Sequence, residues 1–162
     1  MNIIFIPIFV AFLDQASKIY IKNYWLDNNL LFYSKINIIG DFVRFVFVEN
    51  PGIAFGIDTS KFHLVIIILT VFAVVSLTLY LYKLIKENNP DKYAISFILG
   101  GAIGNLIDRF FVLFPTLNYK GVIDFIDIGY KNFRWYTFNI ADASITIGLI
   151  LYIYQMYLVK GK

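Results

Sequence analysis

One uninterrupted apolar run ties this chain to a membrane. Residues 62–82 read FHLVIIILTVFAVVSLTLYLY, with no Asp, Glu, Lys or Arg. A helix needs about 20 residues to cross the hydrocarbon core of a bilayer. Lys61 and Lys83 flank the run, as expected where a helix leaves the apolar layer. We therefore predict a transmembrane helix over 62–82.

Three further apolar runs have a similar length but contain a few charges. They cover 3–21, interrupted by Asp14 and Lys18, 93–113, interrupted by Asp108 and Arg109, and 138–159, interrupted by Asp142. The predicted fold class is therefore integral membrane and mainly α, with four transmembrane helices in a single domain over 1–162. A cleaved signal peptide is the alternative for the first run, but that run lacks a basic n-region.

The composition excludes several classes of site. The chain is 59% hydrophobic and 15% charged, whereas soluble domains average about 25% charged residues. It has no Cys and one His, which excludes a disulfide framework and a thiol nucleophile and makes a multi-His metal site improbable. We expect no metal and no organic cofactor. The net charge of +3 is dispersed, so we expect no nucleic-acid partner.

The basic residues predict the orientation. Lys83, Lys86 and Lys92 crowd the short connection 83–92, and Lys160 and Lys162 end the chain. By the positive-inside rule both termini are cytoplasmic. Loops 22–61 and 114–137 then lie outside.

The two outer loops have the composition of strands rather than of linkers. Segment 36–50 places β-branched and aromatic residues around a Gly-Asp turn, which predicts a hairpin, and 119–138 is likewise aromatic and β-prone. We expect both segments to lie on the outer membrane surface.

Charges inside a membrane span cost free energy, so their placement is informative. Asp14 and Lys18 are four residues apart and share a helix face, which predicts a structural ion pair or a pair that contacts substrate. Asp108 and Arg109 follow a GxxxG at Gly100 and Gly104, a common close-packing surface between membrane helices. We expect helix contact there, with an interfacial salt bridge.

Asp124 and Asp142 are the candidate catalytic pair. Counted from the ends of the predicted spans, both fall near the outer interface. Two close carboxylates can share one proton and act as acid and base on a water molecule. Spacing alone leaves alternatives open: Asp124 as a turn former, Asp142 as a helix-start acid, or Asp127 as the partner in place of Asp124.

Other functions remain possible at this point. A small four-helix transporter would use Asp14, Lys18 and Asp142 as a proton or ion relay, and a scaffold would pack through Gly100 and Gly104. The lone His63 is expected to be an interfacial residue. The adjacent Ser-Lys pairs point about 100° apart on a helix and do not form a natural dyad.

Five sequence blocks resemble one known family. In order they are DQASK at 14–18, NPGIAF at 50–55, GAIGNLIDR at 101–109, VIDF at 122–125 and FNIAD at 138–142. They resemble the DxxSK, NxGxAF, GxxGNxxDR, VxDF and FNxAD blocks of bacterial lipoprotein signal peptidases, the type II signal peptidases. Each block is short, but the five together cover essentially the whole chain.

The resemblance implies a function and a site. Asp124 and Asp142 would be the catalytic aspartates of a membrane aspartic endopeptidase, and Asp127 would drop out. The site-lining or supporting residues would be Asn50, Gly52, Asn105, Arg109 and Asn139, with Asp14 and Lys18 bracing the first helix.

The resemblance also implies a fold detail, a substrate and a location. An extracytoplasmic β-cradle would accompany the four helices. The enzyme would cut diacylglyceryl-modified prolipoproteins before the lipidated cysteine, in the cytoplasmic (inner) membrane of a bacterium, with its site at the outer face. Membrane lipids and globomycin-like inhibitory peptides would be its other partners.

Overall fold

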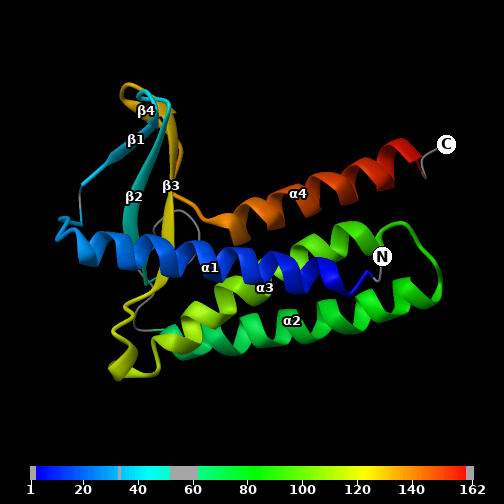
Figure 1. The fold of residues 1–162 in the computed structure, drawn as a ribbon. Coiled ribbons are helices and arrows are strands. Elements are labelled where there is room, and N and C mark those ends of the chain that lie inside the picture. Colours follow the sequence, from blue (N-terminus) through cyan, green and yellow to red (C-terminus); the bar gives the residue numbers. More distant parts are fainter. Residues whose placement is uncertain (1–2, 33, 52–61, 160–162) are drawn as a thin grey trace. The chain divides into compact units, whose positions relative to one another are not determined.

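The computed structural model describes residues 3–32, 34–51 and 62–159. The predicted site residue Gly52 and most of the NPGIAF block lie outside the described residues. The elements, drawn in Figure 1, are α1 (Phe5–Asp27), β1 (Ile36–Ile39), β2 (Val43–Asn50), α2 (His63–Lys86), α3 (Lys92–Phe111), the 3-10 turn η3 (Pro115–Leu117), β3 (Val122–Tyr130), β4 (Phe133–Arg134), α4 (Ile140–Tyr154) and the π-helical segment η4 (Gln155–Val159).

The chain groups into two compact units. The first contains 1–14, 65–107 and 140–162, and the second contains 15–64 and 108–139. The first unit is helical. The second contains the sheet, the C-terminal half of α1 and the C-terminal end of α3.

The four predicted apolar runs all form helices. Among the described residues, α2, α3 and α4 extended to Tyr157 are long and apolar enough to cross a membrane. Helix α1 begins at Phe5, two residues into the predicted run 3–21, and continues to Asp27. It is not among those three, since it contains Asp14 and Lys18 within its apolar length and Lys22 and Asp27 beyond it.

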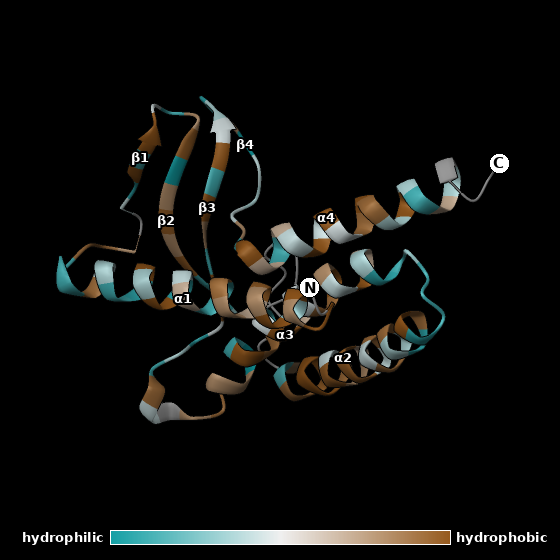
Figure 2. Cartoon of the chain, turned by 45° about the vertical axis from the view of Figure 1, so that its right-hand side comes forward, coloured by the Kyte–Doolittle hydropathy of each residue, from teal (hydrophilic) through white to brown (hydrophobic). Residues whose placement is uncertain are grey.

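Helix α2 shows why these helices need lipid around them. Apolar side chains along its length are exposed, with Ile68 and Phe72 among the most exposed, and Figure 2 shows the helix mostly in the colour of hydrophobic residues. A soluble helix buries its apolar stripe against the protein. An apolar helix left this exposed is stable when the surrounding medium is hydrocarbon.

Glycines let the helices of the first unit pack closely. A Cβ on Gly100 would meet Val10 of α1, and one on Gly101 would meet the backbone carbonyl of Ala141 in α4. A Cβ on Gly148 would meet the Ala94 carbonyl of α3 at 2.7 Å. The close-packing surface predicted from Gly100 and Gly104 is therefore confirmed, and α3 uses it toward both α1 and α4.

The second unit contains a four-stranded antiparallel sheet in the order β1-β2-β3-β4. The predicted hairpin over 36–50 is confirmed, with Gly40 at a φ of 51° in its turn. Strand β3 pairs along β2 so that Asp124 lies opposite Val48 and Val122 opposite Asn50. Aromatic contacts such as Phe45 with Phe125 pack on this sheet. The β-prone stretch predicted at 119–138 supplies β3 and β4.

Candidate active site

Asp124 lies on β3 in the second unit and is almost fully buried, with 4% of its surface exposed. Its Oδ1 accepts a hydrogen bond from Asn139 Nδ2 at 2.7 Å, and its Oδ2 accepts one from Asn50 Nδ2 at 3.2 Å. Hydrogen bonds from amide N–H groups favour the ionised form of a carboxylate. The two asparagines also fix the orientation of the side chain.

Asn139 is itself held in place. It is completely buried, and its Nδ2 also donates to the Ile123 carbonyl at 3.2 Å. The backbone beside it pairs with β3, since Phe138 exchanges hydrogen bonds with Ile126. The side chain of Asn139 therefore contacts β3, and the backbone of the preceding residue, Phe138, forms a β-bridge to the same strand.

Asn50 reaches Asp124 because Gly121 has no side chain. A Cβ on Gly121 would run into the backbone carbonyl of Asn50. The two strands therefore approach closely at the point where β2 ends and β3 begins. This close approach brings the Asn50 amide to the carboxylate of Asp124, the third residue of β3.

A buried ion pair supports the strand next to Asp124. Lys18 Nζ of α1 lies 2.9 Å from Asp108 Oδ2 of α3, with both side chains 1% exposed. The same oxygen accepts the backbone N–H of Ile123 at 3.1 Å, and Oδ1 accepts Gln15 Nε2 at 2.9 Å. Asp108 thus holds the residue before Asp124, and Lys18 balances its charge.

Asp142 lies in the first turn of α4, in the first unit, and is half-buried. Its Oδ1 accepts a hydrogen bond from Asn105 Nδ2 of α3 at 2.8 Å. Near it, Asp14 Oδ1 accepts the backbone N–H of Ala141 at 2.9 Å. The first N–H groups of a helix have no acceptor within that helix. Asp14 supplies an acceptor for one such group at the start of α4.

Arg109 and Asp127 were also predicted as possible site residues, and both lie in the second unit. The carbonyl of Arg109 lies 3.2 Å from Nε2 of His63, so the lone histidine joins the start of α2 to the end of α3. Asp127, the rival partner, is bound by Arg134 Nε at 2.7 and 2.9 Å. The suggested Asp14–Lys18 pair stays a prediction.

A half-buried loop residue, Tyr119, adds to the electrostatics of this unit. Burial raises the pKa of Tyr119, and the carboxylates of Asp108 and Glu49 raise it further. The phenol therefore stays protonated at neutral pH. Lys22 Nζ lies 3.4 Å from the centre of its ring and donates to the Asn118 carbonyl at 2.8 Å, which ties the loop to α1.

Sequence reasoning missed three contributors: Gln15, Gly121 and the role of Asp108 toward β3. Gln15 lies in the DQASK block and Asp108 in the GAIGNLIDR block, so these blocks could have pointed to them. Their partners lie far along the chain, and spacing within one segment carries no information on such contacts.

The chain matches the family model described as signal peptidase (SPase) II over residues 6–158. A lipoprotein signal peptidase of Buchnera aphidicola is 39% identical over 97% of this chain and 92% of its own length, and one of Clostridium novyi is 37% identical over 91% and 92%. A solved bacterial membrane enzyme is 32% identical, with a TM-score of 0.72 over 99% of this chain and 94% of that chain. With these matches spanning nearly the whole of the described helices and sheet, the chain belongs to the signal peptidase II family.

Proposed function

We propose that Asp124 and Asp142 are the catalytic pair with which this signal peptidase cleaves prolipoproteins. The family removes signal peptides, and the curated relatives are named lipoprotein signal peptidases. The chain is accordingly a multi-pass membrane protease. Its family identity favours hydrolysis over the ion relay that Asp14, Lys18 and Asp142 could have formed.

The observation that carries the proposal is the place of Asn139. Its amide binds the carboxylate of Asp124 at 2.7 Å, and Asp142 follows only three residues later. Three residues span at most about 11 Å when fully extended. The chain itself therefore limits the distance between the two carboxylates, independently of any other packing.

The chemistry follows from one shared proton. One carboxylate, ionised, takes a proton from a water molecule, and the resulting oxygen attacks the scissile carbonyl. The other, protonated, polarises that carbonyl and then gives its proton to the leaving amine as the C–N bond breaks. Two like charges at close range do not both ionise cheaply, which keeps the single proton on the pair.

The supporting residues act on the pair or on the substrate backbone. Asn50 and Asn139 orient Asp124, and Asn105 orients Asp142. We include Gly52 and Arg109 in the site because they occupy the family's NxGxAF and GxxGNxxDR blocks. Lys18 and Asp14 brace α1 against Asp108 and the start of α4.

The proposal also names a substrate bond and a cellular location. We propose that the bond cut is the one before a diacylglyceryl-modified cysteine, in the bacterial inner membrane, with the site at the outer face and both termini cytoplasmic. Membrane lipids would surround the exposed apolar side chains of the helices. Globomycin-like cyclic peptides would inhibit by occupying the substrate's place.

The test is to replace each aspartate by its isosteric amide. Asp124→Asn and Asp142→Asn should each reduce cleavage of a lipidated prolipoprotein below detection, because neither amide can carry the shared proton. The matched control is Asp27→Asn, an exposed aspartate at the end of α1, which should cleave normally. Helical content and thermal unfolding in detergent would verify folding. Cleavage by a double Asn variant would refute the pair.

A further inference from the structure

We propose that the far end of the sheet is a membrane anchor that inserts into the interfacial layer of anionic phospholipids. The aromatic tip consists of the apolar side chains at the two turns, namely Ile39, Phe42, Tyr130, Phe133 and Trp135. The inference rests on the proposed function only in one respect: it gives the anchor the task of holding Asp124 at a fixed depth.

The aromatic tip is strongly exposed. Phe133 is 91% exposed, Trp135 68% and Tyr130 64%, and Ile39 and Phe42 on the neighbouring turn are also more than half exposed. Adjacent exposed apolar side chains on one surface mark an interaction site. Trp and Tyr in particular concentrate where a bilayer meets water, because one part of each ring system is apolar and another part polar.

Hydrogen bonds hold the two turns together as one surface. The Gly129 N–H donates to the Phe42 carbonyl at 3.0 Å, and the Lys131 N–H donates to Asp41 Oδ2 at 3.2 Å. Lys131 has a φ of 52°, which places it in the left-handed region at the tight turn between β3 and β4. The aromatic tip is therefore presented by a fixed backbone.

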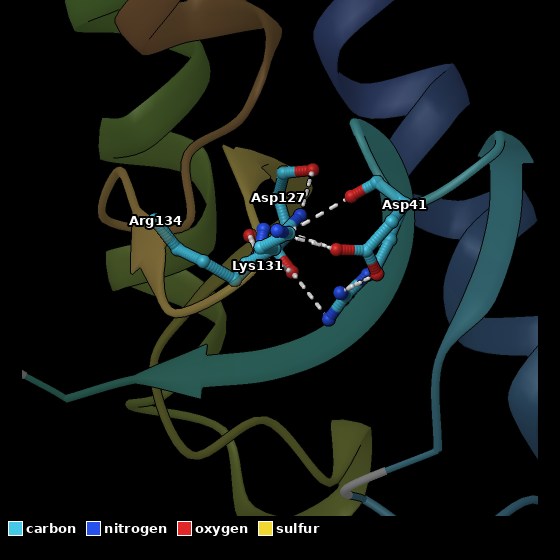
Figure 3. Close-up of polar contacts among 5 residues, drawn as sticks. Asp41, Asp127, Lys131 and Arg134 are labelled. Carbon is cyan, nitrogen blue, oxygen red and sulfur yellow. Dashed lines mark hydrogen bonds and ion pairs between the residues drawn. The ribbon is translucent and has the colours of Figure 1, made fainter.

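A cluster of charges beneath the turns reinforces them (Figure 3). Arg134 Nε donates to both carboxylate oxygens of Asp127, at 2.7 and 2.9 Å. Its NH1 donates to the Asp41 carbonyl at 2.9 Å. Arg44 pairs with Asp41 and lies 4.0 Å from Asp127. Charge-assisted hydrogen bonds in a network hold geometry better than isolated surface pairs.

The charge of the tip selects an anionic surface. The cluster combines Arg44, Lys131 and Arg134 with Asp41 and Asp127, which leaves one positive charge. Basic residues beside apolar ones add attraction to anionic headgroups, at about 1 kcal/mol per Lys or Arg near the surface.

The direction of the sheet supports a lipid partner. Within the second unit, the strands run across the C-terminal half of α1 rather than along it (Figures 1 and 2). If α1 crosses the bilayer, a sheet at its outer end extends along the membrane plane. The aromatic tip then lies at the level of the headgroups, where a bilayer, rather than a soluble partner, is the neighbouring phase.

Strand β3 connects the anchor to the candidate site. Asp124 and Tyr130 lie six residues apart on this strand, which is about 20 Å at 3.3 Å per residue. Because β3 pairs with both neighbours, an anchored tip fixes the height of Asp124 over the membrane. This would set which peptide bond of a membrane-held substrate meets the carboxylate.

The absence of cysteine permits a direct test. Phe133→Cys would carry a single spin label, and its accessibility to oxygen and to a polar nickel reagent would be measured in vesicles of phosphatidylethanolamine and phosphatidylglycerol. Phe72→Cys, on the exposed apolar length of α2, is the matched bilayer reference, and Glu87→Cys is the water reference.

The expected result is a label at 133 that reports lipid contact in the absence of substrate. Its ratio of oxygen to nickel accessibility should lie between those of positions 87 and 72, as expected for the interfacial layer, and should fall when phosphatidylglycerol is omitted. A ratio equal to that of position 87 would overturn the proposal. A label that becomes shielded only when lipoprotein is added would also overturn it, in favour of a protein partner.

A second measurement links the anchor to cleavage. The double variant Phe133→Ser, Trp135→Ser should cleave about tenfold less efficiently in vesicles, which corresponds to a loss of about 1.4 kcal/mol. In detergent micelles its activity should match that of the parent. Equal losses in both media would contradict the depth role. The spin-label result does not depend on catalysis. It therefore tests the anchor whether or not Asp124 and Asp142 prove to be the catalytic pair.

Discussion

At the scale of single residues, Asp108 contributes more than its sequence block indicated. The sequence predicted a helix contact and an interfacial salt bridge for Asp108 and Arg109. The structure gives Asp108 the salt bridge, with Lys18, and adds the N–H of Ile123. One side chain therefore joins two helices to the strand of Asp124. Spacing could place Lys18 on a helix face, but it could not identify a partner on another helix.

Removing Asp108 should therefore destabilise the protein strongly. Asp108→Ala leaves the Lys18 ammonium buried without this partner and removes the acceptor for Ile123. Breaking a buried pair in this way costs about 3–5 kcal/mol. Thermal unfolding in detergent should show a large loss, and the exposed pair Lys83–Glu87, 3.9 Å apart, provides the control, since Glu87→Ala should change stability by less than about 1 kcal/mol. An unchanged midpoint for Asp108→Ala would contradict this account.

At the scale of elements, the sequence located the helices and strands better than their ends. The apolar run 3–21 was predicted as a helix, whereas α1 begins at Phe5 and continues through Lys22 to Asp27. Hydropathy reports the apolar length, whereas a helix ends where its hydrogen bonds end, and polar residues extend helices into water. The hairpin at 36–50 was predictable because alternation and a Gly-Asp turn are local features. Pairing of β2 with β3 was not, since the two strands lie more than seventy residues apart.

The close helix packing in the first unit should be sensitive to one added methyl group. Gly101→Ala places a Cβ against the backbone carbonyl of Ala141, which cannot turn aside as a flexible side chain would. Overpacking of this kind typically costs about 1–3 kcal/mol. The unfolding midpoint of Gly101→Ala in detergent should fall accordingly.

Gly40 provides the comparison for that variant. A Cβ on Gly40 meets nothing within 4 Å, so Gly40→Ala should cost only the strain of a φ of 51°, about 1 kcal/mol. If both substitutions lowered the midpoint equally, the contact with Ala141 would not be the cause of the loss.

At the scale of the whole molecule, composition and order of motifs were the most informative features. The apolar content predicted a membrane protein, and the five blocks in sequence predicted the family, which the comparisons confirm. The blocks also identified Asn50, Asn105 and Asn139, whose contacts with the aspartates appear in the structure. Gly121 escaped prediction because its importance lies in the absence of a side chain, and only the three-dimensional approach of β2 to β3 reveals it.

The same composition predicts the response to chelators. With no Cys and one His, the chain lacks the ligands that protein zinc sites ordinarily use, and the proposed chemistry needs only a shared proton. EDTA should leave cleavage of a lipidated prolipoprotein unchanged. Strong inhibition that added zinc reverses would contradict the prediction.

The ion pair between Lys18 and Asp108 also has a consequence for biosynthesis. Roughly 90 residues separate the two, so at about 5–20 residues per second the ribosome completes Asp108 some 5–20 s after Lys18. The first helix must therefore meet the translocation machinery before this partner exists. During that interval Asp14, one helical turn away, is the acid within reach of the ammonium. The spacing of Asp14 and Lys18 is thus suited to the insertion of a nascent chain as well as to the finished protein.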